Sequence, residues 1–172
     1  NLPIQSGSDR VLKMMNRGYN PDQYRAAVSS IRERLPGAGL TTDLIVGHPG
    51  ETDDDFRRSL DALEEFRFDL VHSAAYSPRE GTSAASREDQ VPGEVKMRRL
   101  NEVNALQARI AREINSSLVG SEYDILIDDL APRGSGLLQG RTPSDKVVLV
   151  EGGEELLGRF ARVEITGGES WR

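Results

Sequence analysis

The sequence predicts an α/β fold: a partial (β/α) barrel of three parallel strands with helices over residues 1–118, followed by a small antiparallel β-barrel over residues 119–172. Short apolar runs alternate with helical patterns up to residue 118, which is typical of parallel strands joined by right-handed crossovers. From residue 120 on, short apolar runs recur between Gly- and Pro-containing turns, which is typical of a small barrel. Because three strands cannot close a barrel, we expect at least one open sheet edge.

The first predicted elements are a strand end at Leu2–Gln5, a polar loop, and a short helix at Val11–Met15. The strand end has no preceding element with which to pair, and the first residue is Asn1. We therefore expect the chain to be excised from a longer protein.

The second helix has a near-complete start signal. Asn20 is the expected N-cap, Pro21 stands at the first helical position, and Gln23 completes the spacing of a capping box. Pro36 and the glycine after it end this helix.

Two further strands are predicted at Leu40–Val46 and Leu70–Tyr76, each followed by a helix. Thr52 is the expected cap of the first of these helices, and Asp53–Asp55 lie in its first turn, where carboxylates favour the helix dipole. The second is a long helix over Gly93–Leu118. We assign its arginines to a solvated face: Arg98, Arg99, Arg109 and Arg112.

The pattern changes near Val119. Four or five short strands are predicted from there, among them Tyr123–Ile127, Leu137–Gly140, Lys146–Val150 and Phe160–Ile165.

Composition narrows the possible functions. The net charge of −6 argues against a broadly basic surface for nucleic acid. The absence of cysteine excludes disulfides, thiolate-bound zinc and Cys-ligated iron–sulfur clusters within this chain. No apolar run approaches the roughly 20 residues of a membrane span, and no signal peptide is evident. We expect a soluble, cytoplasmic protein without a membrane partner.

Residues 2–19, which begin Leu-Pro-Ile-Gln-Ser-Gly-Ser-Asp, resemble the fourth barrel strand and the following helix of one family, the radical S-adenosylmethionine (SAM) methylthiotransferases. Residues 42–52 match the fifth strand and residues 76–85 the sixth. Residues 138–142 and 157–165 are similar to the C-terminal TRAM domain of the family. The resemblance thus implies the C-terminal half of the radical SAM barrel over residues 1–118 and a TRAM domain over residues 119–172.

The resemblance also implies a reaction. In the family, one [4Fe–4S] cluster cleaves SAM reductively to a 5′-deoxyadenosyl radical, which takes hydrogen from C2 of adenine. A methylated sulfur on a second cluster is then transferred. The Gln-Ser-Gly-Ser-Asp form at Gln5–Asp9 is most similar to the branch that acts on N6-isopentenyladenosine at position 37, in the anticodon loop of tRNA. The threonylcarbamoyladenosine branch remains an alternative, whereas the ribosomal-protein branch usually has Gln-His-Ala-Ser-Asp.

The departures from the family pattern concern the clusters. The cysteines that hold the two [4Fe–4S] clusters, including the Cys-x₃-Cys-x₂-Cys segment, are absent from this chain. We therefore expect the chain to be inactive by itself. We also expect the parent enzyme to be monomeric. The chain itself could associate through an open sheet edge.

By resemblance, eight residues are candidates to bind SAM: Gln5, Ser6, Ser8, Arg17, Asp43, Ile45, Gly47 and Tyr76. The first three would bond the ribose and amino-acid moieties. Arg17 would oppose the carboxylate, although a cation also suits a helix C-terminus. Asp43 would face the barrel interior, where ribose, tRNA and a structural arginine are all possible partners. Ile45 and Gly47 would pack on adenine and Tyr76 would line the cavity; core packing remains open for Ile45 and Tyr76.

The TRAM domain is the expected contact with tRNA, and five cations are available for phosphate: Arg133, Arg141, Lys146, Arg159 and Arg162. From Val119 on there are 6 basic and 10 acidic residues, so we expect the domain to position tRNA rather than to supply most of the affinity.

Two other classes of function remain open. One is a binding module whose small barrel recognises RNA without catalysis. The other is a hydrolase that uses Asp43 and Glu51, although no recognisable motif supplies an activating histidine. With His48 and His72 as the two histidines and no cysteine, we expect no metal site. In the loop after the fifth strand, His48 stands where the family usually has phenylalanine, and we expect little consequence. His72 is predicted to be a hydrogen-bonded structural residue.

Overall fold

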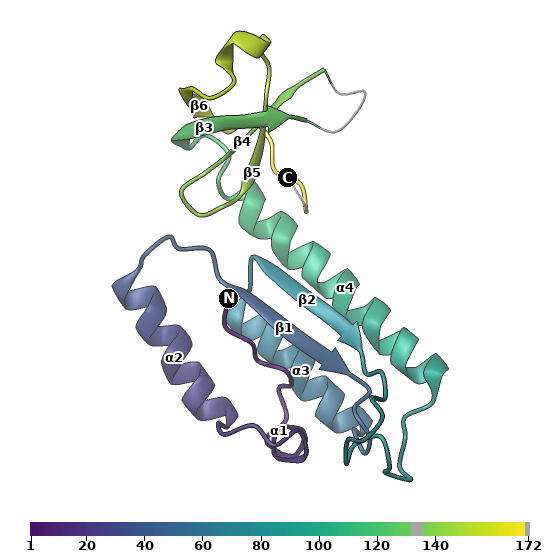
Figure 1. Cartoon of the computed structure of the whole chain (residues 1–172). Helices are drawn as coiled ribbons and strands as arrows, with labels where there is room; N and C mark the ends of the chain where they lie inside the picture. Colours follow the sequence, from purple (N-terminus) through teal and green to yellow (C-terminus); the bar gives the residue numbers. More distant parts are fainter. Residues whose placement is uncertain (132–135, 171–172) are drawn as a thin grey trace. The chain divides into compact units, whose positions relative to one another are not determined.

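The computed structural model describes residues 1–131 and 136–170 (Figure 1). The chain divides into two compact units: Asn1–Pro36 with Leu40–Ile110, and Gly37–Gly39 with Ala111–Arg172. Helix α4 (Gly93–Ser116) runs through the division, and the boundary predicted near Val119 lies just beyond its end. No helix in the described ranges is both long and apolar enough to cross a membrane.

The first unit is built on a parallel pair of strands, β1 (Thr41–Val46) and β2 (Leu70–Ala75). Where a third strand was predicted, the structure has an isolated bridge between Gln5 and Leu44. The reason is local. Gln5 has a φ of 62°, in the left-handed region, and this conformation ends the extended segment that pairs with β1.

Four helices belong wholly or partly to this unit: α1 (Asp9–Met14), α2 (Pro21–Arg34), α3 (Asp53–Phe66) and α4. Both predicted helix starts are confirmed. Asn20 and Gln23 form the capping box of α2, and Thr52 caps α3 in a second capping box.

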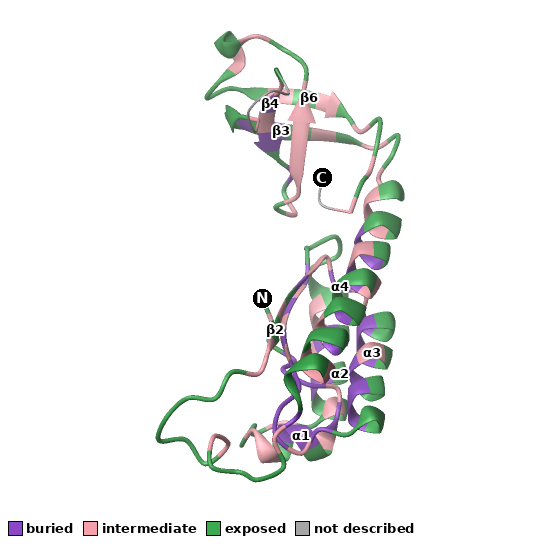
Figure 2. Ribbon diagram, turned by 90° about the vertical axis from the view of Figure 1, so that its right-hand side faces the viewer, coloured by how far each residue is buried: buried purple, intermediate pink, exposed green. Residues whose placement is uncertain are grey.

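Helices α3 and α4 cover one face of the sheet (Figure 2). On that face Ser73 Oγ lies 2.6 Å from Asn104 Oδ1 of α4, and Gln107 Nε2 of α4 donates to the carbonyl of Phe68. The opposite face carries Asp43 and Ile45, half-buried, and the exposed His72 and Ala74, paired in register as Asp43 with His72 and Ile45 with Ala74.

The second unit holds an antiparallel sheet in the order β5-β4-β3-β6. Its strands are β3 (Glu122–Leu130), β4 (Leu138–Arg141), β5 (Val147–Val150) and β6 (Phe160–Glu164). The sheet buries Ile125, Ile127 and Leu138. The predicted barrel is not closed among the described residues, because both β4 and β6 pair with β3 and this leaves β5 and β6 at opposite edges.

Candidate functional site

The loop after β1 is shaped by two glycines. Gly47 and Gly50 have φ values of 73° and 79°, which other residues adopt at a cost. A Cβ on Gly47 would lie 2.4 Å from Cγ of Lys96, so the loop backbone lies directly against α4. Glu51 closes the loop, since its Oε2 accepts a hydrogen bond from Gly47 N at 2.6 Å. The loop over residues 47–51 is therefore packed and hydrogen-bonded.

A buried ion pair holds this loop on α4. Arg99 Nη1 lies 2.7 Å from Glu51 Oε2, and the two side chains are only 4% and 0% exposed. Arg99 also donates to Asp53 Oδ1 at 2.7 Å. Burial raises the pKa of Glu51, while the bonds from Gly47 and Arg99 act in the opposite direction. The prediction that Arg99 lies on a solvated helix face is wrong, and a fully enclosed Glu51 argues against the hydrolase hypothesis.

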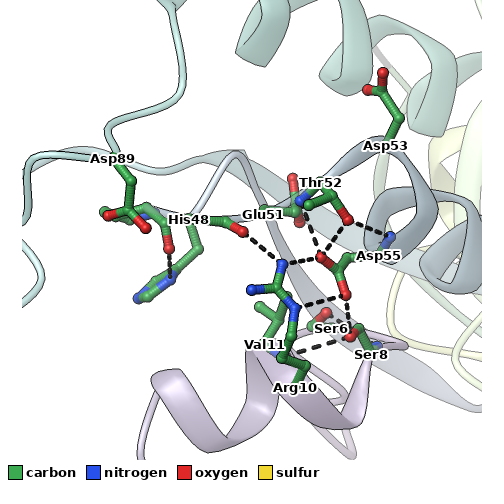
Figure 3. A network of polar contacts seen from close by, with 12 residues as sticks. Ser6, Ser8, Arg10, Val11, His48, Glu51, Thr52, Asp53, Asp55 and Asp89 are labelled. Atoms are coloured by element: carbon green, nitrogen blue, oxygen red, sulfur yellow. Dashed lines mark hydrogen bonds and ion pairs between the residues drawn. The ribbon is translucent and has the colours of Figure 1, made fainter.

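A second network centres on Asp55 (Figure 3). Its carboxylate accepts hydrogen bonds from Ser8 Oγ at 2.6 Å, from Thr52 Oγ1 at 2.6 Å, and from the guanidinium of Arg10. Arg10 also donates to the carbonyl of Gly50 at 2.6 Å. Burial would raise the pKa of Asp55, but the hydrogen bonds from Arg10, Ser8 and Thr52 lower it well below the ordinary value. Asp55 thus joins the loop before α1 to the loop before α3.

Two of the predicted cofactor ligands lie within this network. Ser8 caps α1 and donates to Asp55, and Ser6 Oγ lies 3.4 Å from Ser59 Oγ. Both serines are buried. Their hydroxyls are engaged within the chain, and their role as cofactor ligands stays a prediction.

Three other predicted residues meet at one pocket. Arg17, Ile45 and Tyr76 line a space of about 450 Å³, together with Arg79. The rest of the lining consists of small residues: Ala74, Ala75, Ser77, Thr82 and Ala84.

Gln5 and Asp43 do not line this pocket, but each has a hydrogen-bond partner in the first unit. Gln5 accepts a hydrogen bond from Arg17 Nη2 at 3.1 Å, which ties the left-handed residue to the pocket wall. Asp43 accepts a hydrogen bond from Asn1 Nδ2 at 2.8 Å.

Tyr76 is held on two sides. The ring of His48 lies edge-on at 5.3 Å between centroids, and Lys96 Nζ lies 5.1 Å from the Tyr76 ring centroid. The backbone N–H of Tyr76 donates to the carbonyl of Val46 at 2.8 Å. Burial lowers the pKa of His48, which favours the neutral form of its ring.

Within residues 1–131 and 136–170, no group of His, Cys, Asp and Glu side chains could hold a metal ion. His72, predicted to be hydrogen-bonded, is exposed, and its ring has no hydrogen bond in the described part of the chain.

Three of the predicted phosphate contacts of the second unit are held by other side chains. Arg141 Nη1 lies 2.9 Å from Asp145 Oδ1, and Arg162 Nη2 lies 2.9 Å from Glu122 Oε2. Lys146 Nζ donates to Asn115 Oδ1 at 3.0 Å, and Arg159 is exposed. Arg133 lies outside the described residues.

Sequence reasoning missed an exposed aromatic residue on this sheet. Phe160 is 77% exposed and stands opposite Leu126, which in turn stands opposite Arg141 on the other neighbouring strand. Arg162 lies two residues along β6 and shares this face. The alternation of Phe160 and Arg162 with apolar residues was the available signal.

Two segments of the chain match protein families. Residues 1–63 match the Radical SAM superfamily, and residues 116–171 match the TRAM domain. These matches confirm the resemblance that the motifs predicted, to a radical SAM segment followed by a TRAM domain.

The names of curated relatives point to a narrower class of protein than the two family matches do. The chain is 44% identical over 170 residues to the tRNA-2-methylthio-N(6)-dimethylallyladenosine synthase of Dictyoglomus thermophilum. These 170 residues are 99% of the chain and 39% of the relative. The synthase of the same name from Acetivibrio thermocellus is 43% identical over 170 residues, 99% of the chain and 35% of the relative. That from Carboxydothermus hydrogenoformans is 42% identical over 168 residues, 98% of the chain and 38% of the relative. The chain thus spans well under half the length of these relatives.

Proposed function

We propose that this chain is part of an enzyme that transfers a methylthio group to C2 of N6-dimethylallyladenosine (isopentenyladenosine) at position 37 of tRNA. The observation that carries the proposal is the similarity over 98–99% of the chain to synthases named for this product. Such an enzyme works on tRNA in the cytoplasm, and we propose that the whole enzyme is monomeric.

Within that enzyme, the first unit would form one side of the SAM site. The pocket volume of about 450 Å³ is in the range of small-molecule sites. Arg17, held by Gln5, would bind the carboxylate, because its planar fork matches two oxygens. Ile45 and Tyr76 would offer apolar surface to adenine. Gly47 does not line the pocket, so its proposed packing on adenine rests on the sequence alone, whereas Asp43 lies on the open face of the sheet, where a ribose hydroxyl could bond.

The iron–sulfur clusters do not fit this chain. It has no cysteine, so its residues supply no thiolate ligand. When bound and reduced by a cluster held elsewhere in the enzyme, SAM would supply the radical that takes hydrogen from the unactivated C2 position. The residues described here would bind and orient SAM and exclude water from it.

The second unit would contact the tRNA anticodon loop. Arg141, Lys146, Arg159 and Arg162 are the described cations proposed for phosphate, and Phe160 offers an exposed ring on which an unstacked base could lie. Arg133 belongs to the same proposal from sequence alone. Because Arg141 and Arg162 are already paired with carboxylates, phosphate binding would exchange one anion for another.

The test is nucleoside mass spectrometry of tRNA from cells with and without the complete gene. We expect loss of 2-methylthio-N6-dimethylallyladenosine and accumulation of its unthiolated precursor in the deleted strain. Loss of the threonylcarbamoyl counterpart instead would assign the enzyme to that branch and refute the proposed substrate. An unchanged tRNA profile would refute methylthiotransfer to tRNA altogether.

A further inference from the structure

The pocket of the first unit has an uneven charge. Among the described residues that line it are two arginines, Arg17 and Arg79, and no acidic side chain. This contrasts with the chain as a whole, whose net charge is −6. A small cavity with two guanidinium groups and no internal counter-charge favours anionic groups.

The two arginines also differ from their neighbours in their bonding. Arg10, Arg87 and Arg99 each form an ion pair with a carboxylate. Arg17 donates instead to the neutral amide of Gln5, and the guanidinium of Arg79 has no hydrogen bond or ion pair in residues 1–131 and 136–170. Both pocket arginines are therefore available to a ligand.

The loop that carries Arg79 is built as a turn. The carbonyl of Arg79 accepts hydrogen bonds from Thr82 N at 3.2 Å and from Thr82 Oγ1 at 2.7 Å. Gly81, with a φ of 79°, supplies the left-handed residue of this turn. Since Thr82 lines the same pocket, these bonds fix the backbone of Arg79 at the pocket.

We propose that Arg79 binds a backbone phosphate next to the target adenosine of the RNA, while Arg17 binds the carboxylate of SAM. This inference rests on the proposed function.

SAM carries a single carboxylate together with an ammonium and a sulfonium group, so it can neutralise one guanidinium but not two. The other anion that the proposed reaction brings is the RNA backbone. A nucleotide presented to a pocket is unstacked from its neighbours, and its phosphates come with it. A guanidinium fork suits phosphate oxygens.

The experiment compares Arg79→Ala with Arg17→Ala in the complete, cluster-loaded gene product. Affinity for an anticodon stem-loop RNA is measured by fluorescence anisotropy at several salt concentrations, and affinity for SAM by equilibrium dialysis. We expect Arg79→Ala to weaken RNA binding roughly tenfold and to lower the salt slope by about one. Its affinity for SAM should stay within about twofold, and Arg17→Ala should show the opposite pattern.

Arg57→Ala is the matched control, because Arg57 is an exposed arginine on α3 paired with Asp54 and does not line the pocket. It should change neither affinity. The inference is overturned if Arg79→Ala leaves RNA affinity and salt slope unchanged, or if it weakens SAM binding as much as Arg17→Ala does. A gene product that modifies tRNA while Arg79→Ala has no effect would refute this inference alone. A gene product that neither binds nor modifies tRNA would refute the proposed function itself.

Discussion

Two arginine–carboxylate pairs, one from each unit of the chain, lie in opposite environments. In the first unit Arg99 and Glu51 are almost completely enclosed, at 4% and 0% exposure. In the second unit Arg162 and Glu122 are both more than half exposed. A buried pair cannot exchange its partner for water or ligand without a large desolvation cost, whereas an exposed pair can. The buried pair therefore holds a loop in place, whereas the exposed pair leaves its arginine available to bind another anion.

The largest effect is expected from Arg99→Ala. Removing the guanidinium leaves the carboxylate of Glu51 buried and without its counter-charge. We expect the free energy of unfolding to fall by about 3–5 kcal/mol. Urea titration followed by the helical circular dichroism signal measures the change. Arg98→Ala is the control, since Arg98 is the exposed neighbour, 3.7 Å from Asp53. Equal effects of the two variants would contradict the distinction between buried and exposed pairs.

An intermediate effect is expected from Asp55→Asn, and it should depend on pH. The hydrogen bonds from Arg10, Ser8 and Thr52 lower the pKa of Asp55 in the folded state, although burial opposes them. In the acid range the unfolded state then binds more protons than the folded state, so this contribution rises with pH. It is fully present above the ordinary aspartate pKa, near 3.8, and is lost as the pH falls through the lower folded value.

At pH 7 we expect Asp55→Asn to lower the free energy of unfolding by about 2 kcal/mol, with the difference from the unchanged protein shrinking below about pH 4. Urea titrations over a series of pH values would follow this difference. Asp54→Asn provides the comparison, because Asp54 lies in the same helical turn but is exposed. A difference that stayed constant into the acid range would mean that Asp55 does not act through its charge.

Interactions between residues close in the sequence could be predicted from it, whereas hydrogen bonds and ion pairs between distant residues could not. The capping boxes at Asn20 and Thr52 were predictable, because each is complete within four residues. The partners of Asp55 were not, since Ser8 and Arg10 lie 47 and 45 positions away. Arg99 was misassigned for the same reason: its partner Glu51 is 48 positions distant, and a helical pattern alone gives arginine to the solvent.

The candidate site shows the same division. The family motifs predicted Arg17, Ile45 and Tyr76, and the structure brings these three to one pocket. The motifs did not reveal Arg79 as a lining residue, because its relation to Arg17 arises only when the loops after α1 and β2 come together.

The smallest effect on stability is expected from Arg162→Ala, and it tests the other half of the comparison. Arg162 Nη2 lies 2.9 Å from Glu122 Oε2, as close as many buried pairs, but both side chains are in water. We expect the free energy of unfolding to change by about 0.5 kcal/mol or less, and a double-mutant cycle with Glu122→Ala to give a coupling of the same size. A coupling above about 1.5 kcal/mol would show that this pair, like Arg99 and Glu51, serves the fold. The alternative result has two parts: the coupling is small, and Arg162→Ala in the complete gene product weakens RNA binding and makes it less dependent on salt. That result would show that Glu122 pairs with Arg162 only until a phosphate replaces it.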